Sequence, residues 1–304
     1  MATDRYLSER AALYVPFFSF IVLLCAVILL LPYETVYIRD RTYLSMFLVV
    51  IVLSVFVFSI GTLYNFLMWM RGKGMTTTPE RRLIGFAKLA IGSLAHGRLV
   101  KATRTLLKDA LYLSKLKDRS VSRWFMHLMI LGGFIFMFIL DLIVTFSLDV
   151  LRYQPMIDET GWAKLWLRDF GFDLVGFMML IGLVMACIRR SILKPKIVRT
   201  ELPDAVSILF LLAVVLGGFI LEGMGIAGGI PGHDQNVEYS FVGYAFSLMM
   251  PASSGDWYDA VWLVHGVMSA LLIAYIPFSK LFHMIATPIA IELDRMMIDK
   301  GGSA

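Results

Sequence analysis

Apolar residues in this chain collect in six long runs separated by polar segments. The runs cover about residues 11–32, 45–70, 124–147, 172–188, 204–224 and 258–285. Each has about the length of 20 apolar residues that a helix needs to cross a bilayer. No run alternates with a period of two, and within lipid every backbone polar group must be bonded inside the segment, so helices are predicted. The pattern predicts an all-α fold: a polytopic membrane bundle of six transmembrane helices.

The basic residues predict how the helices are oriented. Only 17% of the residues are charged and the mean hydropathy is +0.76, whereas a soluble domain carries about 25% charged residues. Residues 71–123 contain 13 Lys or Arg and residues 189–204 contain five, but residues 225–257 contain none. Basic loops stay in the cytoplasm. Both basic segments and both termini are therefore expected on the cytoplasmic side of the cytoplasmic (inner) membrane.

The regions flanking the predicted spans also carry information. The apolar run at 11–31 is too long for a signal-peptide core, so a retained first span is expected. From Pro79 to Lys117, apolar residues recur near helical spacing with Lys and Arg between them. This predicts one or two amphipathic helices at the cytoplasmic surface, in contact either with lipid headgroups or with a cytoplasmic subunit.

Three histidines lie in or next to the predicted spans, where a ligating side chain is a functional hypothesis by default. His265 and His283 are 18 residues apart, which is five turns and about 27 Å along a continuous helix. His127 opens the third span at its cytoplasmic end, at the depth of His283. Facing imidazoles on two helices are what bis-histidine haem requires. The alternative is histidines that only hydrogen-bond between helices.

Nearby residues fit the same interpretation. Arg123 precedes His127 by four residues and Lys280 precedes His283 by three, so both can neutralise haem propionates. Three glycines leave room for a flat macrocycle, or serve close helix packing: Gly132, Gly133 and Gly266. The two cysteines form no CxxC or CxxCH pattern, which argues against an iron–sulfur cluster or c-type haem in this chain.

Two segments carry a resemblance to a known family: SRWFMHLMILGGF at 122–134 and WLVHGVMSALLIAYIPFSKLFHM at 262–284. Over about 45–290 the chain resembles cytochrome b subunits of the nitrate reductase gamma type. Relatives include the cytochrome b subunit of heterodisulfide reductase and membrane subunits of sulfate-reducer redox complexes, such as the sulfite-reduction-associated complex. The resemblance implies a five-helix haem-b core with an extra N-terminal helix.

The resemblance also implies two haem b groups, four axial histidines and a site near the outer haem for menaquinone or another quinone. His127 and His283 would then hold the inner haem iron and His265 the outer one. The family carries a second histidine ten residues after the first, where this chain has Met137. Met137 could ligate, His233 could replace it, or the outer site could be five-coordinate or empty.

Two acids are candidates for the proton chemistry of quinol oxidation, because that reaction releases protons with its electrons. Asp141 lies in the outer half of the third span and Glu222 at the outer end of the fifth. Each is a candidate proton acceptor, and the alternative is that it only caps the lipid boundary.

The predicted organisation has three parts: an N-terminal part at 1–44, a haem-b core at 45–290 that includes the basic insertion 71–123, and a cytoplasmic tail at 291–304. We expect one subunit of a quinone-linked oxidoreductase complex, not a complete enzyme alone. The expected partner is a cytoplasmic iron–sulfur subunit of the heterodisulfide reductase kind, with room for further membrane or periplasmic subunits and no nucleic acid. The competing interpretations are a haem-free scaffold or transporter, and a di-haem anchor of a hydrogenase or formate dehydrogenase.

Overall fold

The computed structural model describes residues 41–69, 112–193, 202–233, 235–288 and 290–291. All regular elements in these ranges are helical, in agreement with the predicted class. Five helices among them are long and apolar enough to cross a membrane. The predicted span at 11–32, most of the amphipathic stretch from 79 to 117 and the tail from 292 lie outside the described residues.

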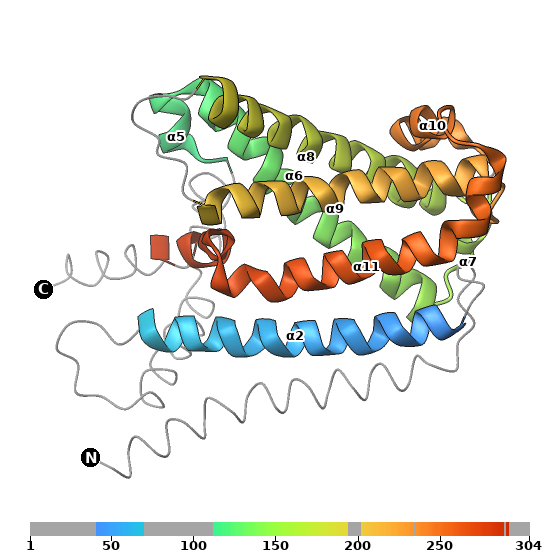
Figure 1. The fold of residues 1–304 in the computed structure, drawn as a ribbon, viewed down its shortest axis with the longest axis horizontal. Helices are drawn as coiled ribbons and strands as arrows, with labels where there is room; N and C mark the ends of the chain where they lie inside the picture. The colour runs from blue at the N-terminus through green and yellow to red at the C-terminus, as the bar shows by residue number, and fades with distance from the viewer. Residues whose placement is uncertain (1–40, 70–111, 194–201, 234, 289, 292–304) are drawn as a thin grey trace, which may run out of the picture.

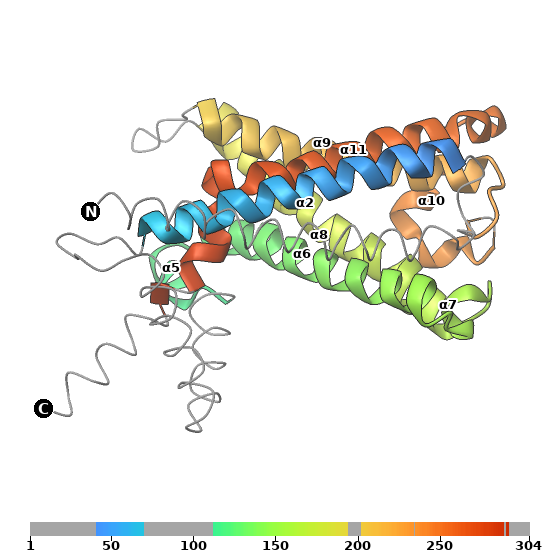
Figure 2. The ribbon, with the colours of Figure 1, turned by 90° about the horizontal axis from the view of Figure 1, so that it is seen from below.

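The five long helices run along one another (Figures 1 and 2). They are α2 (Arg41–Trp69), α6 (Val121–Thr145), α8 (Phe170–Ile188), α9 (Leu202–Ala227) and α11 (Tyr258–Tyr275). Helix α6 packs on α8, α8 on α9, α9 on α11 and α11 on α2, so neighbours in the chain are also neighbours in space apart from α2. The five predicted runs from 45 to 285 correspond to these helices.

Short elements complete the two ends of the bundle. At the end that carries α5 (Ser114–Arg119), the Ser120 hydroxyl accepts from the backbone N–H of Arg123 and caps α6. At the opposite end lie α7 (Gln154–Ile157), the π-helical turn Lys164–Asp169 and α10 (Phe241–Ser247). The orientation predicted from the basic residues puts the α5 end in the cytoplasm.

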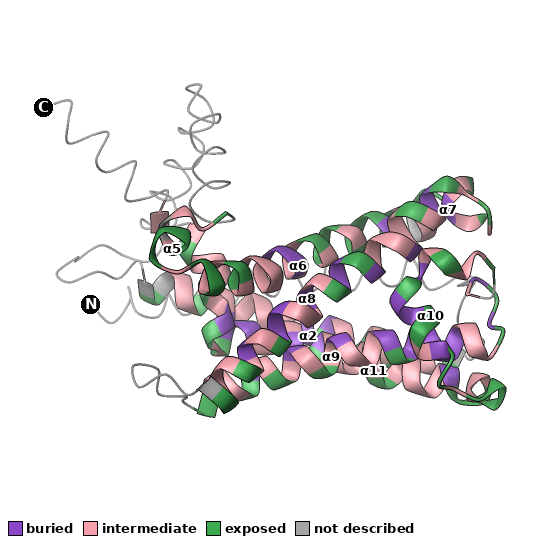
Figure 3. Cartoon of the chain, turned by 90° about the horizontal axis from the view of Figure 1, so that it is seen from above, coloured by how far each residue is buried: buried purple, intermediate pink, exposed green. Residues whose placement is uncertain are grey.

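The core lies where α8 and α9 face each other. Met179 and Leu183 of α8 are buried against Leu211, Val215 and Phe219 of α9. Apolar residues on the outward faces remain exposed, as Figure 3 shows along α2 and α6. This surface suits a helix bundle in lipid, where the solvent is as apolar as the side chains.

The last span is broken, and the expectation of one continuous helix through His283 is wrong. Helix α11 ends at Tyr275, a 3₁₀ turn follows at Ile276–Phe278, and Ser279 is extended. A second 3₁₀ turn at Lys280–Phe282 leads into helical residues 283–288. The break occurs at Pro277, which has no N–H to donate to the helix ladder.

Other helices stabilise this break. The side-chain amide of Asn65 on α2 donates to the carbonyl of Pro277 at 2.5 Å. Gly61 gives room for the bend, because a Cβ there would lie 2.7 Å from Pro277 and 2.8 Å from Phe278. Ser279 accepts from the N–H of Leu281 and so starts the next turn. The polar groups released by the break are therefore bonded, as a membrane interior requires.

Candidate haem site

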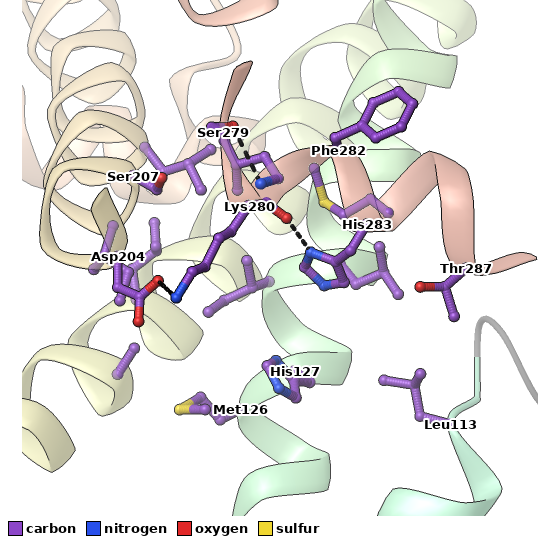
Figure 4. Close-up of a pocket in the computed structure, with 18 of the residues that line it drawn as sticks. Leu113, Met126, His127, Asp204, Ser207, Ser279, Lys280, Phe282, His283 and Thr287 are labelled. Atoms are coloured by element: carbon purple, nitrogen blue, oxygen red, sulfur yellow. Dashed lines mark hydrogen bonds and ion pairs between the residues drawn. The ribbon is translucent and has the colours of Figure 1, made fainter. Parts of the chain in front are cut away.

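His127 and His283 line one cavity of about 790 Å³ at the α5 end of the bundle (Figure 4). His127 comes from the second turn of α6 and His283 from the first helical residue after the break. Figure 4 shows both imidazoles directed into the same space. The sequence prediction that these two histidines lie at one depth is confirmed, although the broken helix, and not its five-turn spacing, brings His283 there.

A hydrogen bond orients the imidazole of His283. Its Nδ1 contacts the carbonyl of Lys280, so Nδ1 is the protonated nitrogen and Nε2 keeps its lone pair. A ring held in this way presents Nε2 to a metal, because the partner of one nitrogen decides which nitrogen binds.

The cavity walls are mainly apolar, with a few charged groups. Ile130, Leu183, Ile208 and Leu211 are among the apolar residues. A volume of this size lies within the roughly 300–1,000 Å³ range of cofactor pockets. Among the described residues no three His, Cys, Asp or Glu side chains gather to hold a bare metal ion. Two imidazoles on an apolar cavity instead fit a haem, whose iron takes only axial ligands from the protein.

The two basic residues predicted as propionate partners have different surroundings. Lys280 lines the cavity, but its ammonium is paired with Asp204 of α9 at 2.9 Å. Arg123 lies on the first turn of α6 and does not line the cavity. Arg190 does line it and is also paired with Asp204, at 3.2 Å. Sequence reasoning used Arg190 only as a topology marker and missed Asp204, although an acid opening an apolar run was a visible signal.

The three glycines divide between the two interpretations. A Cβ at Gly133 would meet Met179 and the backbone of α8, and one at Gly266 would lie 2.9 Å from Phe47 of α2. These two glycines serve helix packing, so the prediction that they make room for a macrocycle is wrong. Gly132 is buried, yet a Cβ there would meet nothing within 4 Å. Gly132 alone of the three borders open space.

His265 occupies a separate position towards the other end of the bundle. Its ring lies against α9, where a Cβ at Gly217 would be 3.1 Å from Nδ1 and a Cβ at Gly218 would be 3.4 Å from Cε1. Nδ1 is buried without a hydrogen-bond partner. A buried unpaired nitrogen is costly and marks a place where a further group belongs. The two glycines that admit the ring were not singled out from the sequence.

Met137 and His233 were the residues considered as partners of His265. Met137 packs in the core, with its Cε 3.5 Å from where a Cβ at Gly176 would lie. The Nε2 atom of His233 is 3.0 Å from the hydroxyl of Tyr258 and 3.4 Å from the guanidinium of Arg168. His233 is thus held in the α10 end of the bundle, and this geometry argues against it as an iron ligand.

The two candidate acids differ in their surroundings. Asp141 is exposed on α6. The carboxyl of Glu222 hydrogen-bonds to that of Asp173, which is fully buried on α8. Asp173 also accepts from the N–H of Val242 at 2.5 Å and of Gly243 at 3.4 Å. Two carboxyls in hydrogen-bond contact share a proton, because two carboxylates have no donor between them. Asp173 was missed, although an acid inside an apolar run was a visible signal.

Comparisons with known proteins agree with the resemblance expected from the sequence. Residues 153–298 match the nitrate reductase gamma subunit family, a range that contains His265 and His283 but not His127. The chain is 28% identical to the E subunit of dihydromethanophenazine:CoB–CoM heterodisulfide reductase from Methanosarcina acetivorans over 265 residues, 82% of this chain and 89% of that protein. The corresponding protein of Methanosarcina barkeri is 28% identical over 266 residues, with the same coverage.

A shorter similarity joins the chain to the EtfAB:quinone oxidoreductase of Syntrophomonas wolfei. It is 32% identical over 126 residues, which are 38% of this chain and 18% of that protein. No solved structure matches. The predicted resemblance to nitrate reductase gamma-type and heterodisulfide reductase membrane subunits is confirmed.

The surroundings of His233 predict a pH dependence of stability. Burial, followed by the charges of Arg168 and Lys164, lowers the pKa of His233 from 6.5 to about 3. Between these values the unfolded chain binds the proton and the folded chain does not, so stability falls as the pH drops from 6.5 towards 3, by up to about 1.4 kcal/mol per pH unit. Unfolding of detergent-solubilised His233→Gln should depend less on pH over this window than wild type. Equal pH slopes for the two proteins would contradict the burial of a neutral His233.

Proposed function

We propose that this chain, similar over most of its length to nitrate reductase gamma-type and heterodisulfide reductase membrane subunits, is the haem-b membrane subunit of a respiratory oxidoreductase complex. It passes electrons between membrane quinone, such as menaquinone, and a cytoplasmic iron–sulfur subunit. The observation that carries the proposal is the cavity lined by His127 and His283. The quinone enters from the similarity to a quinone oxidoreductase, and the iron–sulfur partner from the heterodisulfide reductase relatives.

The residues have the following roles in this proposal. His127 and His283 hold the inner haem iron through Nε2 atoms, with the Lys280 carbonyl keeping the proton on Nδ1 of His283. The apolar walls exclude water, and Arg190 with Lys280 provides positive charge at the margin. When bound there, haem b supplies reversible one-electron chemistry at its iron.

The outer site is built around His265. Its position against Gly217 and Gly218 supports a second haem towards the opposite end of the bundle. Met137 is the proposed sixth ligand, and its thioether would raise the reduction potential relative to a second imidazole. Glu222 lies one turn beyond Gly218 on α9, so it is nearer to this site than the exposed Asp141.

The inner site is tested by haem counting in the purified protein. Replacement of either ligand, in His127→Leu or His283→Leu, should remove about one haem per chain and leave the outer one, because an apolar side chain cannot bind iron. The measurement is a dithionite-reduced minus oxidised spectrum with pyridine haemochrome quantification. His233→Gln is the matched control and should keep the full haem content. Unchanged haem content in both ligand variants would refute the inner site.

The sixth ligand of the outer site is tested with Met137→Leu, which preserves volume in the core. Loss of the thioether should lower the midpoint potential of the outer haem and alter its low-spin spectrum, without affecting the inner haem. A redox titration of wild type and variant measures both. An unchanged spectrum and potential would exclude Met137 as a ligand.

The proton acceptor is tested by comparing Glu222→Gln with Asp141→Asn. Because the Asp173–Glu222 pair can take up one proton, Glu222→Gln should slow the reduction of bound haem by a menaquinol analogue by roughly 10²-fold or more, the range for loss of an acid–base group. Asp141→Asn should leave the rate near that of wild type. Normal rates in the Glu222 variant and in the double variant would remove both acids from the proposal.

A further inference from the structure

Asp204 joins three elements around the His127–His283 cavity. It lies at the start of α9, its side chain is only 13% exposed, and one oxygen pairs with Lys280 at 2.9 Å. Its other oxygen pairs with Arg190, in the turn that follows α8, at 3.2 Å. One carboxylate therefore holds two cations that come from different parts of the chain (Figure 4).

This interaction matters because the chain is broken just before Lys280. Ser279 is extended, so the segment that carries His283 is not held by the hydrogen-bond ladder of α11. Besides the Ser279 cap and the buried side chain of Leu281, the ion pair with Asp204 ties this segment to the bundle.

A short path then leads from Asp204 to the imidazole. The carbonyl of Lys280 contacts Nδ1 of His283. The same residue thus binds Asp204 through its side chain and orients His283 through its backbone. A shift of Lys280 would turn the ring of His283 relative to the cavity.

We infer that Asp204 is a positioning residue: through Lys280 it holds His283 in the orientation that binds the inner haem iron. The inference rests on the proposed function. Arg190 strengthens the effect by fixing the carboxylate from the other side. The competing explanation is that Asp204 acts on the site only through its charge.

Two single variants separate position from charge. Asp204→Asn and Lys280→Met break the same ion pair but change the net charge in opposite directions. If Asp204 positions His283, both variants should shift the low-spin EPR signal of the ferric inner haem in the same direction, because both free the ring. Both should also weaken retention of the inner haem by roughly 10-fold or more, as loss of a ligand's supporting partner does.

The double variant and two controls complete the experiment. Because one interaction is removed twice, the double variant should retain haem no worse than the weaker single variant. Asp204→Glu should restore the wild-type signal. Lys117→Met removes an exposed cation that binds the hydroxyl of Tyr112 at the same end of the bundle, and it should leave the signal unchanged.

The inference would be overturned if the two single variants moved the midpoint potential in opposite directions while the EPR signal and haem retention stayed unchanged, since that is a pure charge effect. If the wild type binds no haem, the proposed function fails and the contact is tested separately. Hydrogen–deuterium exchange of residues 279–288 in haem-free protein should then rise in Asp204→Asn but not in Lys117→Met. Equal exchange in all three proteins would overturn the positioning role itself.

Discussion

The hydrogen bond from Asn65 to the carbonyl of Pro277 supports the feature on which the candidate site depends, the break in the last span. Inside a membrane a helix can be interrupted only where the released polar groups find partners within the protein. Asn65 on α2 and Ser279 at the break provide such partners. The segment beyond the break can therefore leave the axis of α11 and bring His283 to the cavity that His127 lines.

The two ends of the bundle are built differently, and this suits a protein proposed to connect a membrane carrier with a cytoplasmic partner. The α5 end combines the His127–His283 cavity with the cations held by Asp204. The α10 end carries a closed polar network in which Lys164, fully buried, pairs with Asp169 at 2.9 Å and Glu159 at 3.1 Å. A buried ammonium requires such partners, so this network stabilises the end of the bundle nearer to His265.

Much of the architecture could be predicted from the sequence, because a bilayer imposes simple rules on it. Length and hydropathy located the five long helices that the structure describes, and the depth of His127 and His283 was predicted correctly. The spacing argument for His283 failed for a local reason. It assumed an unbroken helix across Pro277, and only the tertiary contacts with Asn65 and Gly61 show how the chain bends there.

Other parts of the site depended on contacts between distant segments. Asp204 meets Lys280 across 76 positions of the sequence, and Asp173 meets Glu222 and the start of α10. No spacing rule predicts such pairs, although each is an acid in or beside an apolar run and so a candidate for attention. Gly133 and Gly266 were misinterpreted because a glycine that admits a cofactor and one that admits a neighbouring helix look alike in a sequence.

The most direct test of the central claim is a reduced-minus-oxidised optical spectrum of the purified wild-type protein, recorded during a redox titration with haem counted per chain. The account predicts b-type haem, in two separable components that correspond to the His127–His283 and His265 sites. A protein that contains no haem after expression with adequate haem supply would contradict it, and would favour a haem-free membrane scaffold or transporter.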